Sequence, residues 1–170
     1  VLGYLKIPGF SGYLHPYDEN NIIGVGRQDN NLKLSLFNVD NVTDPQETAK
    51  FIVQGEWSDS TVLTDHKGFL FDRSKQLLAF PVSINWVVVT HDYYDKSFWQ
   101  GALVFNISLT DGFVLKGNVT HLDNNTYQWD GGNLVKRTLY IDNVLYTVSD
   151  RKVKLSSLED LTEIREIQLP

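Results

Sequence analysis

Apolar residues recur along this chain in short runs, separated by turns rich in Asp, Asn, Gly and Pro. Runs of about four to eight residues, several with an alternation of period two, predict β-strands. The alternation is plainest at residues 33–36 (KLSL) and 154–157 (KLSS), which we interpret as strands with one buried face. No segment predicts a helix longer than one turn, because the best helical stretch, residues 44–50, is too short. The pattern therefore predicts an all-β protein.

The strand-length runs repeat as three similar units, at approximately residues 1–56, 57–122 and 133–170. Each unit has three runs, then a turn, then a fourth run. Four antiparallel strands joined by tight turns form the blade of a β-propeller. A β-sandwich also has regularly spaced strands, but three units with one order of strands and turns are not expected of it. We predict a β-propeller-like fold of about three four-stranded antiparallel blades, a partial propeller in a single domain.

Three blades are too few for a closed ring, since propellers typically have four to eight. The two end blades would expose apolar faces and strand edges, which promote association. Two hypotheses follow. Either the remaining blades belong to a longer chain, as a first residue Val1 and the absence of Met also indicate, or copies assemble. Of the assemblies, we favour a two-fold homodimer that forms a six-bladed ring.

Several segments resemble one family along nearly the whole chain. They are residues 12–20 (GYLHPYDEN), 32–39 (LKLSLFNV), 65–72 (DHKGFLFD), 99–105 (WQGALVF), 135–141 (VKRTLYI) and 145–150 (LYTVSD). Together they are similar to archaeal and bacterial secreted proteins with a C-terminal β-propeller domain of unknown function. The resemblance implies the C-terminal part of a longer propeller, an exported location and no established activity. It offers no catalytic residues.

The composition of the chain excludes several classes of partner and site. The net charge is −6 and the 15 basic residues are scattered, whereas nucleic-acid binding needs clustered Lys and Arg. No apolar run approaches the roughly 20 residues of a membrane span. The absence of Cys excludes disulfides and thiolate zinc sites.

Two regions are candidate ligand-binding sites. An insertion at residues 83–100 of the second unit is rich in aromatic residues, and long excursions from a scaffold often carry function; its alternative is a β-hairpin that extends the blade. Polar residues also recur where each unit begins, and they would either line a pocket for a small anionic or carbohydrate ligand or hydrogen-bond neighbouring blades together. The candidate residues are His15, Asp18, Asp65, His66, Lys67, Tyr93, Tyr94, Trp99, Lys136 and Arg137.

Catalytic motifs are missing from the sequence. There is no nucleophile elbow and no phosphate-binding glycine loop. The four histidines do not have the spacing of a metal site along the sequence. A zinc site whose ligands come from different blades remains an alternative. A pair of acids for glycan hydrolysis would come from Asp65, Asp72, Asp92, Asp95, Asp130 and Asp142. We predict no cofactor, with calcium at the turns of residues 40–44 and 123–125 as the weak alternative.

Four Asn-x-Ser/Thr sequons occur, at Asn41, Asn106, Asn118 and Asn124. Asn41 and Asn124 lie in predicted turns, and Asn106 in a strand that we expect to be buried and therefore unmodified. We predict a non-enzymatic binding or structural module of an exported or cell-surface protein, with a carbohydrate or protein ligand. The alternatives are a glycan-acting hydrolase and a pure self-assembly module.

Overall fold

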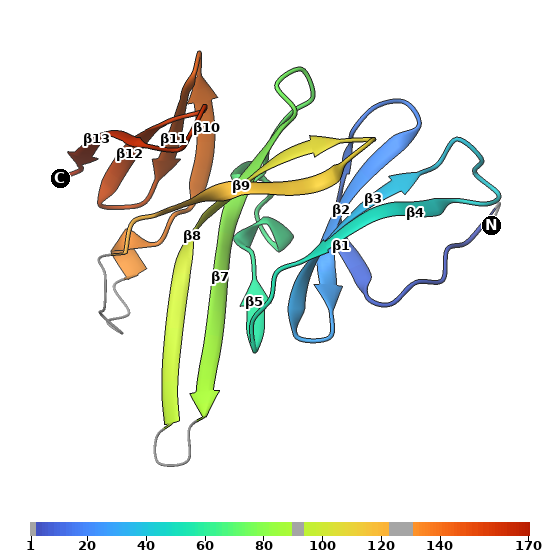
Figure 1. The fold of residues 1–170 in the computed structure, drawn as a ribbon, viewed down its shortest axis with the longest axis horizontal. Helices are drawn as coiled ribbons and strands as arrows, with labels where there is room; N and C mark the ends of the chain where they lie inside the picture. The colour runs from blue at the N-terminus through green and yellow to red at the C-terminus, as the bar shows by residue number, and fades with distance from the viewer. Residues whose placement is uncertain (1–2, 90–93, 123–130) are drawn as a thin grey trace.

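Three antiparallel sheets follow one another along the chain in a computed structural model that describes residues 3–89, 94–122 and 131–170 (Figure 1). Blade 1 contains β1 (Phe10–Pro16), β2 (Asn21–Gln28), β3 (Asn31–Asn38) and β4 (Gln46–Ile52). Blade 2 contains β5 (Trp57–Asp59), β6 (Leu70–Asp72), β7 (Leu77–Val89), β8 (Tyr94–Ser108) and β9 (Gly112–Thr120). Blade 3 contains β10 (Arg137–Ile141), β11 (Val144–Val148), β12 (Lys152–Ser157) and β13 (Glu163–Gln168). The prediction of an all-β protein is confirmed.

Blade 2 has a divided first strand. β5 and β6 pair with the same edge of β7, through Asp59 opposite Ser83 and Leu70 opposite Ala79. Between them lie two 3₁₀ turns, η1 (Thr61–Leu63) and η2 (His66–Gly68), and a third, η3 (Gly131–Asn133), precedes blade 3. The Ser60 hydroxyl and the Asp65 carboxylate accept backbone N–H groups at the starts of η1 and η2, because the first turn leaves such donors unpaired.

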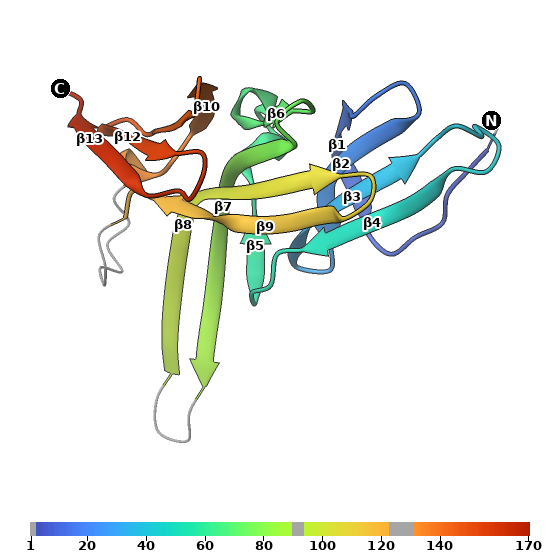
Figure 2. The ribbon, with the colours of Figure 1, turned by 45° about the horizontal axis from the view of Figure 1, so that its top comes forward.

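Within the insertion, residues 83–89 and 94–100 continue β7 and β8 as two long paired strands that project from the blade (Figures 1 and 2). The pairing runs from Leu77 opposite Asn106 to Val89 opposite Tyr94. Beyond the ends of β5 and β9, the two strands pair only with each other. The interpretation of this insertion as a blade-extending hairpin is confirmed, and its role in ligand binding stays a prediction.

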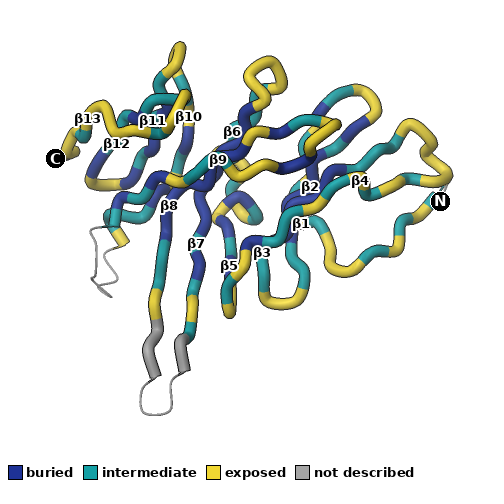
Figure 3. The backbone as a smooth tube through the Cα atoms, viewed as in Figure 1, coloured by how far each residue is buried: buried dark blue, intermediate teal, exposed yellow. Residues whose placement is uncertain are grey.

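Blade 2 is the centre of the molecule because both of its faces are covered (Figure 3). Successive side chains of β7 point to opposite faces, so Leu78 and Phe80 pack into the cluster shared with blade 1, while Leu77 and Ala79 pack toward blade 3. The cluster at blade 1 is large and aromatic. The cluster at blade 3 is smaller, with Leu145 as its fully buried residue from that blade.

The interpretation of residues 33–36 as a half-buried strand was wrong. β3 is buried on both faces, and the Lys33 side chain is only 2% exposed. Its ammonium lies 2.8 Å from the Glu47 carboxylate and donates to the Pro8 carbonyl oxygen, because the segment before β1 passes over this face. A buried lysine is tolerated when its charge is paired in this way.

The outward faces of the two end blades are largely apolar, although the segment before β1 and the Lys33–Glu47 ion pair cover part of the face of blade 1. On blade 1 a groove of about 490 Å³ lies between the segment before β1 and the sheet. Its apolar lining includes Leu5, Ile7, Phe10, Leu14, Ile22 and Phe37. On blade 3 the side chains that alternate away from blade 2 form a largely apolar sheet face, made by Leu139, Ile141, Val144, Tyr146, Val148, Val153, Leu155 and Ile167. Arg137, Ser157 and Arg165 share this face at its edges. Among the described residues, no helix is long and apolar enough to cross a membrane.

Candidate functional site

Several of the predicted site residues at the start of each unit, namely His15, His66, Asp65 and Arg137, lie at the junctions between blades. At the junction of blades 1 and 2, the His66 ring stacks on Tyr13 with centroids 4.7 Å apart and an interplanar angle of 6°. The Tyr13 hydroxyl is 2.9 Å from Nδ1 of His15, and the His15 ring packs against Phe69 and Phe71. Burial lowers the pKa of His15. The two predicted histidines therefore contribute to one aromatic cluster that joins β1 to η2 and β6.

At the junction of blades 2 and 3, Asp65 lies 2.5 Å from Arg137 at the start of β10. The backbone N–H of Lys67 and then the Arg137 guanidinium lower the pKa of the Asp65 carboxyl. Nearby, the Tyr140 hydroxyl donates to Asp72. Hydrogen bonds from Ser74 and Tyr140 lower the pKa of Asp72 to about 2. Both carboxylates are therefore ionised acceptors that link η2 and β6 to blade 3.

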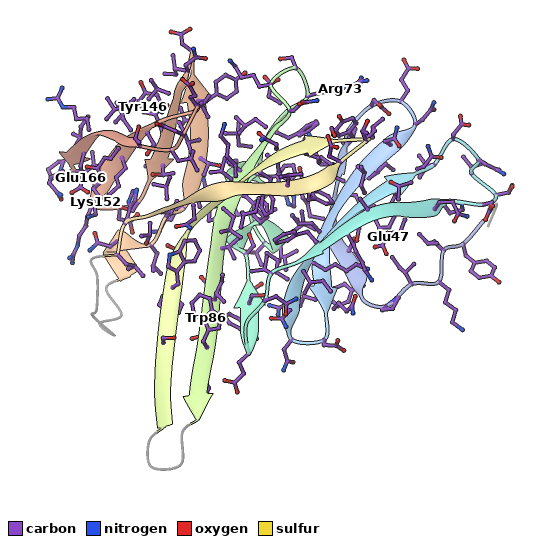
Figure 4. The ribbon with its side chains drawn as sticks, in the orientation of Figure 1. Glu47, Arg73, Trp86, Tyr146, Lys152 and Glu166 are labelled. Atoms are coloured by element: carbon purple, nitrogen blue, oxygen red, sulfur yellow. The ribbon has the colours of Figure 1, made fainter. Side chains whose placement is uncertain are left out.

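The remaining predicted residues are dispersed. Asp18 pairs with Arg73 at 3.4 Å, and Lys136 pairs with Asp150 at 2.5 Å. Trp99 on β8 and Trp86 on β7 line one apolar groove of about 380 Å³. Figure 4 labels Trp86 on the hairpin. Two further predicted residues are not placed: Tyr93 lies outside the described residues, and the side chain of Tyr94 is not among those described. Their part in ligand binding stays a prediction.

A buried polar network at the junction of blades 2 and 3 was not predicted from the sequence. His121, at the end of β9, is fully buried, with Nε2 2.9 Å from the Thr147 hydroxyl and Nδ1 3.0 Å from the Ser149 hydroxyl. Burial, and then the positive charges of Lys152 and Lys154, lower the pKa of His121 to about 4. The imidazole is therefore neutral at pH 7. Its partners are 26 and 28 residues away in the chain, so no local pattern marks them.

Gln100 makes a second polar link across the same junction. Its amide nitrogen donates to the Val135 carbonyl oxygen and its amide oxygen accepts the Val135 N–H, both at 2.8 Å. The Gln100 side chain therefore pairs with a backbone segment as a neighbouring strand would.

We expect Gln100→Ala to lower the free energy of unfolding by about 2 kcal/mol, because both polar groups of buried Val135 lose their partners. The measurement is urea denaturation at pH 7. The matched control is Gln54→Ala, at an exposed position after β4, which should change stability by less than about 0.5 kcal/mol. Equal effects of the two substitutions would contradict this assignment.

No group of three His, Asp or Glu side chains within residues 3–89, 94–122 and 131–170 is arranged to hold a metal ion. In the turn at residues 40–44, Oδ1 of Asn41 accepts hydrogen bonds from Thr43, and Oδ1 of Asp44 accepts one from Gln46. The second calcium turn, at residues 123–125, lies outside the described part, as do His91, Asp92 and Asp130.

The expectation that Asn106 is buried was wrong. Asn106 lies within β8, but its side chain is exposed, because it alternates with the buried Phe105 and Ile107 on the opposite face. Asn41 and Asn118 are exposed as well, and Asn124 lies outside the described residues. All three described sequon asparagines are therefore accessible from solvent.

Blades that pack face to face, with their first strands meeting at the junctions, are the arrangement of a propeller. The β-propeller domain family matches residues 1–161 of this sequence. The chain belongs to the β-propeller domain family. This membership, together with the four-stranded sheets of blades 1 and 3, confirms the predicted fold class.

Relatives of this propeller domain are found among archaeal proteins. An uncharacterized protein of Archaeoglobus fulgidus is 33% identical over 169 residues, which cover 99% of this chain and 22% of that protein. An uncharacterized protein of Methanocaldococcus jannaschii is 33% identical over 150 residues, which cover 88% of this chain and 20% of that protein. The chain thus spans about a fifth of the length of the curated relatives it matches.

Proposed function

We propose that this chain is a non-enzymatic structural segment of an exported propeller. Its three blades form a rigid arc, and both end faces of the arc are docking surfaces for neighbouring blades. In a longer polypeptide the neighbours are further blades, and in the isolated 170-residue chain a second copy takes their place. The closed ring would then present its surface to a carbohydrate or protein ligand outside the cytoplasm.

The observation that carries this proposal is the apolar outward face of blade 3. Its side chains alternate away from blade 2 and belong to all four strands of the sheet, as the inward-facing side chains of blade 2 do. Contiguous apolar surface of this kind marks an interaction site. The apolar groove on blade 1, of about 490 Å³, is the complementary end. The relatives contain enough additional chain to supply further blades.

The state of the acidic groups supports a non-enzymatic role. Glycoside hydrolysis needs one carboxylic acid with a raised pKa facing a second carboxylate. Every described carboxyl whose pKa departs from its usual value has a lowered pKa. These carboxyls are Asp18, Asp65, Asp72, Asp160 and Glu166. Asp65 and Asp72 act as hydrogen-bond acceptors between blades. The sequons at Asn41, Asn106 and Asn118 are exposed, as glycosylation of an exported protein would require.

A charge placed on the open face of blade 3 tests the proposal. Ile141 is 55% exposed, so Ile141→Lys should leave the fold intact while weakening association of the chain at least tenfold. The measurement is sedimentation velocity over a concentration series. The matched control is Leu115→Lys, on the outer strand β9 and 45% exposed. Association that survives Ile141→Lys, or that Leu115→Lys weakens equally, would contradict the proposal.

A further inference from the structure

A cleft between blades 1 and 2 is lined by the aromatic ring of Trp57 and by several polar side chains. It has a volume of about 450 Å³, within the range of small-molecule sites. One wall is β1, with Phe10 and Gly12, and the other is β5, η1 and β7. Trp57 lines it and is 37% exposed. Of the residues and segments predicted from the sequence to bind a ligand, one residue lines this cleft: Ser83, the first residue of the 83–100 insertion.

The indole of Trp57 is held in place by charged neighbours. The Arg27 guanidinium carbon lies 5.7 Å from the Trp57 ring centroid, in a cation–π contact. Nη2 of Arg27 is 2.7 Å from Oδ1 of Asp59, and the backbone N–H of Ser60 donates to the same oxygen. Rigid aromatic side chains on pre-organised supports bind ligands at a low entropic cost. Arg27 and Asp59 also cancel in charge, so the cleft does not select a charged ligand.

Hydrogen-bonding groups in the cleft remain available to a ligand. Within the described part of the chain, no hydrogen bond engages the second oxygen of Asp59 or the hydroxyls of Thr61 and Ser83. The register places Ser83 directly opposite Asp59. The Ser60 hydroxyl, by contrast, is committed to the Pro81 carbonyl oxygen at 2.6 Å. A carboxylate oxygen accepts from ligand hydroxyls, and the two side-chain hydroxyls both donate and accept.

We propose that this cleft binds a neutral sugar residue. The indole face of Trp57 that Arg27 does not cover would stack on the sugar ring, and Asp59, Thr61 and Ser83 would bond to its hydroxyls. A sugar ring has an apolar C–H face that fits an indole plate, and hydroxyls around its edge that fit these polar groups. Asp59 is the one carboxylate lining the cleft, whereas glycoside hydrolysis requires a pair. The site therefore binds sugar without cleaving it.

The test is a glycan array of neutral, sialylated and uronic-acid glycans probed with the 170-residue chain, followed by calorimetric titration of the strongest ligand. Neutral glycans should bind, and Trp57→Ala should weaken binding at least tenfold, while Trp57→Phe, which keeps an aromatic ring, should retain most of it. Ser83→Ala should weaken binding by about fivefold, since a hydrogen bond is worth about 1 kcal/mol. Tyr4→Ala is the control and should leave binding unchanged, because Tyr4 is an aromatic residue that is 82% exposed and does not line the cleft.

Absence of glycan binding, binding confined to acidic glycans, or equal binding by Trp57→Ala and the unchanged protein would overturn the sugar site. Tighter binding of choline than of any glycan would also overturn it, because Trp57 and Asp59 would then serve a cation. None of these results depends on association of the chain. Failure of the sugar site is therefore distinguishable from failure of the docking faces.

Discussion

Replacing Phe105 by alanine is expected to lower the free energy of unfolding by about 4 kcal/mol, because a fully buried aromatic ring is lost and a cavity remains. Phe105 stands at the centre of the blade 1–blade 2 cluster. Its ring centroid is 5.0 Å from Phe51 of blade 1, 6.1 Å from Phe80 and 6.5 Å from Phe113. The substitution therefore weakens both the centre of blade 2 and its attachment to blade 1. The measurement is urea denaturation followed by circular dichroism.

The matched control for Phe105→Ala is Val114→Ala on the neighbouring strand β9. Val114 is exposed, so its truncation should change the free energy of unfolding by less than about 0.5 kcal/mol. A loss below about 1 kcal/mol for Phe105→Ala would mean that the two blades do not share this core.

Acidification is expected to destabilise the protein through His121. The folded state holds this imidazole neutral down to its pKa of about 4, whereas the unfolded chain binds a proton near pH 6.5. Between these values the unfolded state binds more protons, so stability is full above pH 6.5 and falls as the pH drops toward 4. Because one pKa unit corresponds to about 1.4 kcal/mol, the loss is about 3 kcal/mol.

The surroundings of His121 explain why its pKa is lowered. It is sealed among β9, β11 and β12, where Lys152 and Lys154 oppose a further positive charge and Glu166 partly offsets them. Lys152 and Lys154 each lie 3.3 Å from Glu166, and Figure 4 shows Lys152 and Glu166 together on blade 3. Protonation of His121 would place a third cation beside this group.

Urea denaturation at pH 7, 5.5 and 4.5, on the unchanged protein and on His121→Asn, measures this contribution. The variant should be less stable at pH 7, but its stability should fall less with acidification. His66→Gln is the matched control, because the His66 side chain is exposed. An identical pH dependence for His121→Asn and the unchanged protein would rule out His121 as the acid-sensitive group.

Local patterns in the sequence were enough to find most strands. The expected strands at residues 33–36 and 154–157 lie within β3 and β12, since alternation within one run defines a strand. β5 was missed because three residues are fewer than any periodic pattern needs. The two-sided burial of β3 was missed because a lysine in alternation signals a solvent-facing side, unless a distant Glu47 and a preceding segment cover it.

The junction residues show how far sequence reasoning reaches toward a site. Repetition of polar residues at the start of each unit drew attention to Asp65 and Arg137, which meet across a blade junction although they are 72 residues apart in the chain. Repetition carries no information on the pairing of individual atoms. The His121 network and the Trp57 cleft have no counterpart in the other units, so only the three-dimensional arrangement shows them.

The central claim is that the outward faces of blades 1 and 3 are docking surfaces for other blades. Multi-angle light scattering of the 170-residue chain, from micromolar to hundreds of micromolar concentration, tests it most directly. A mass that rises from 19.4 kDa to that of a stable dimer is the result we predict, since two copies would cover all four open faces and complete six blades. A constant mass of 19.4 kDa over the whole series would contradict the claim.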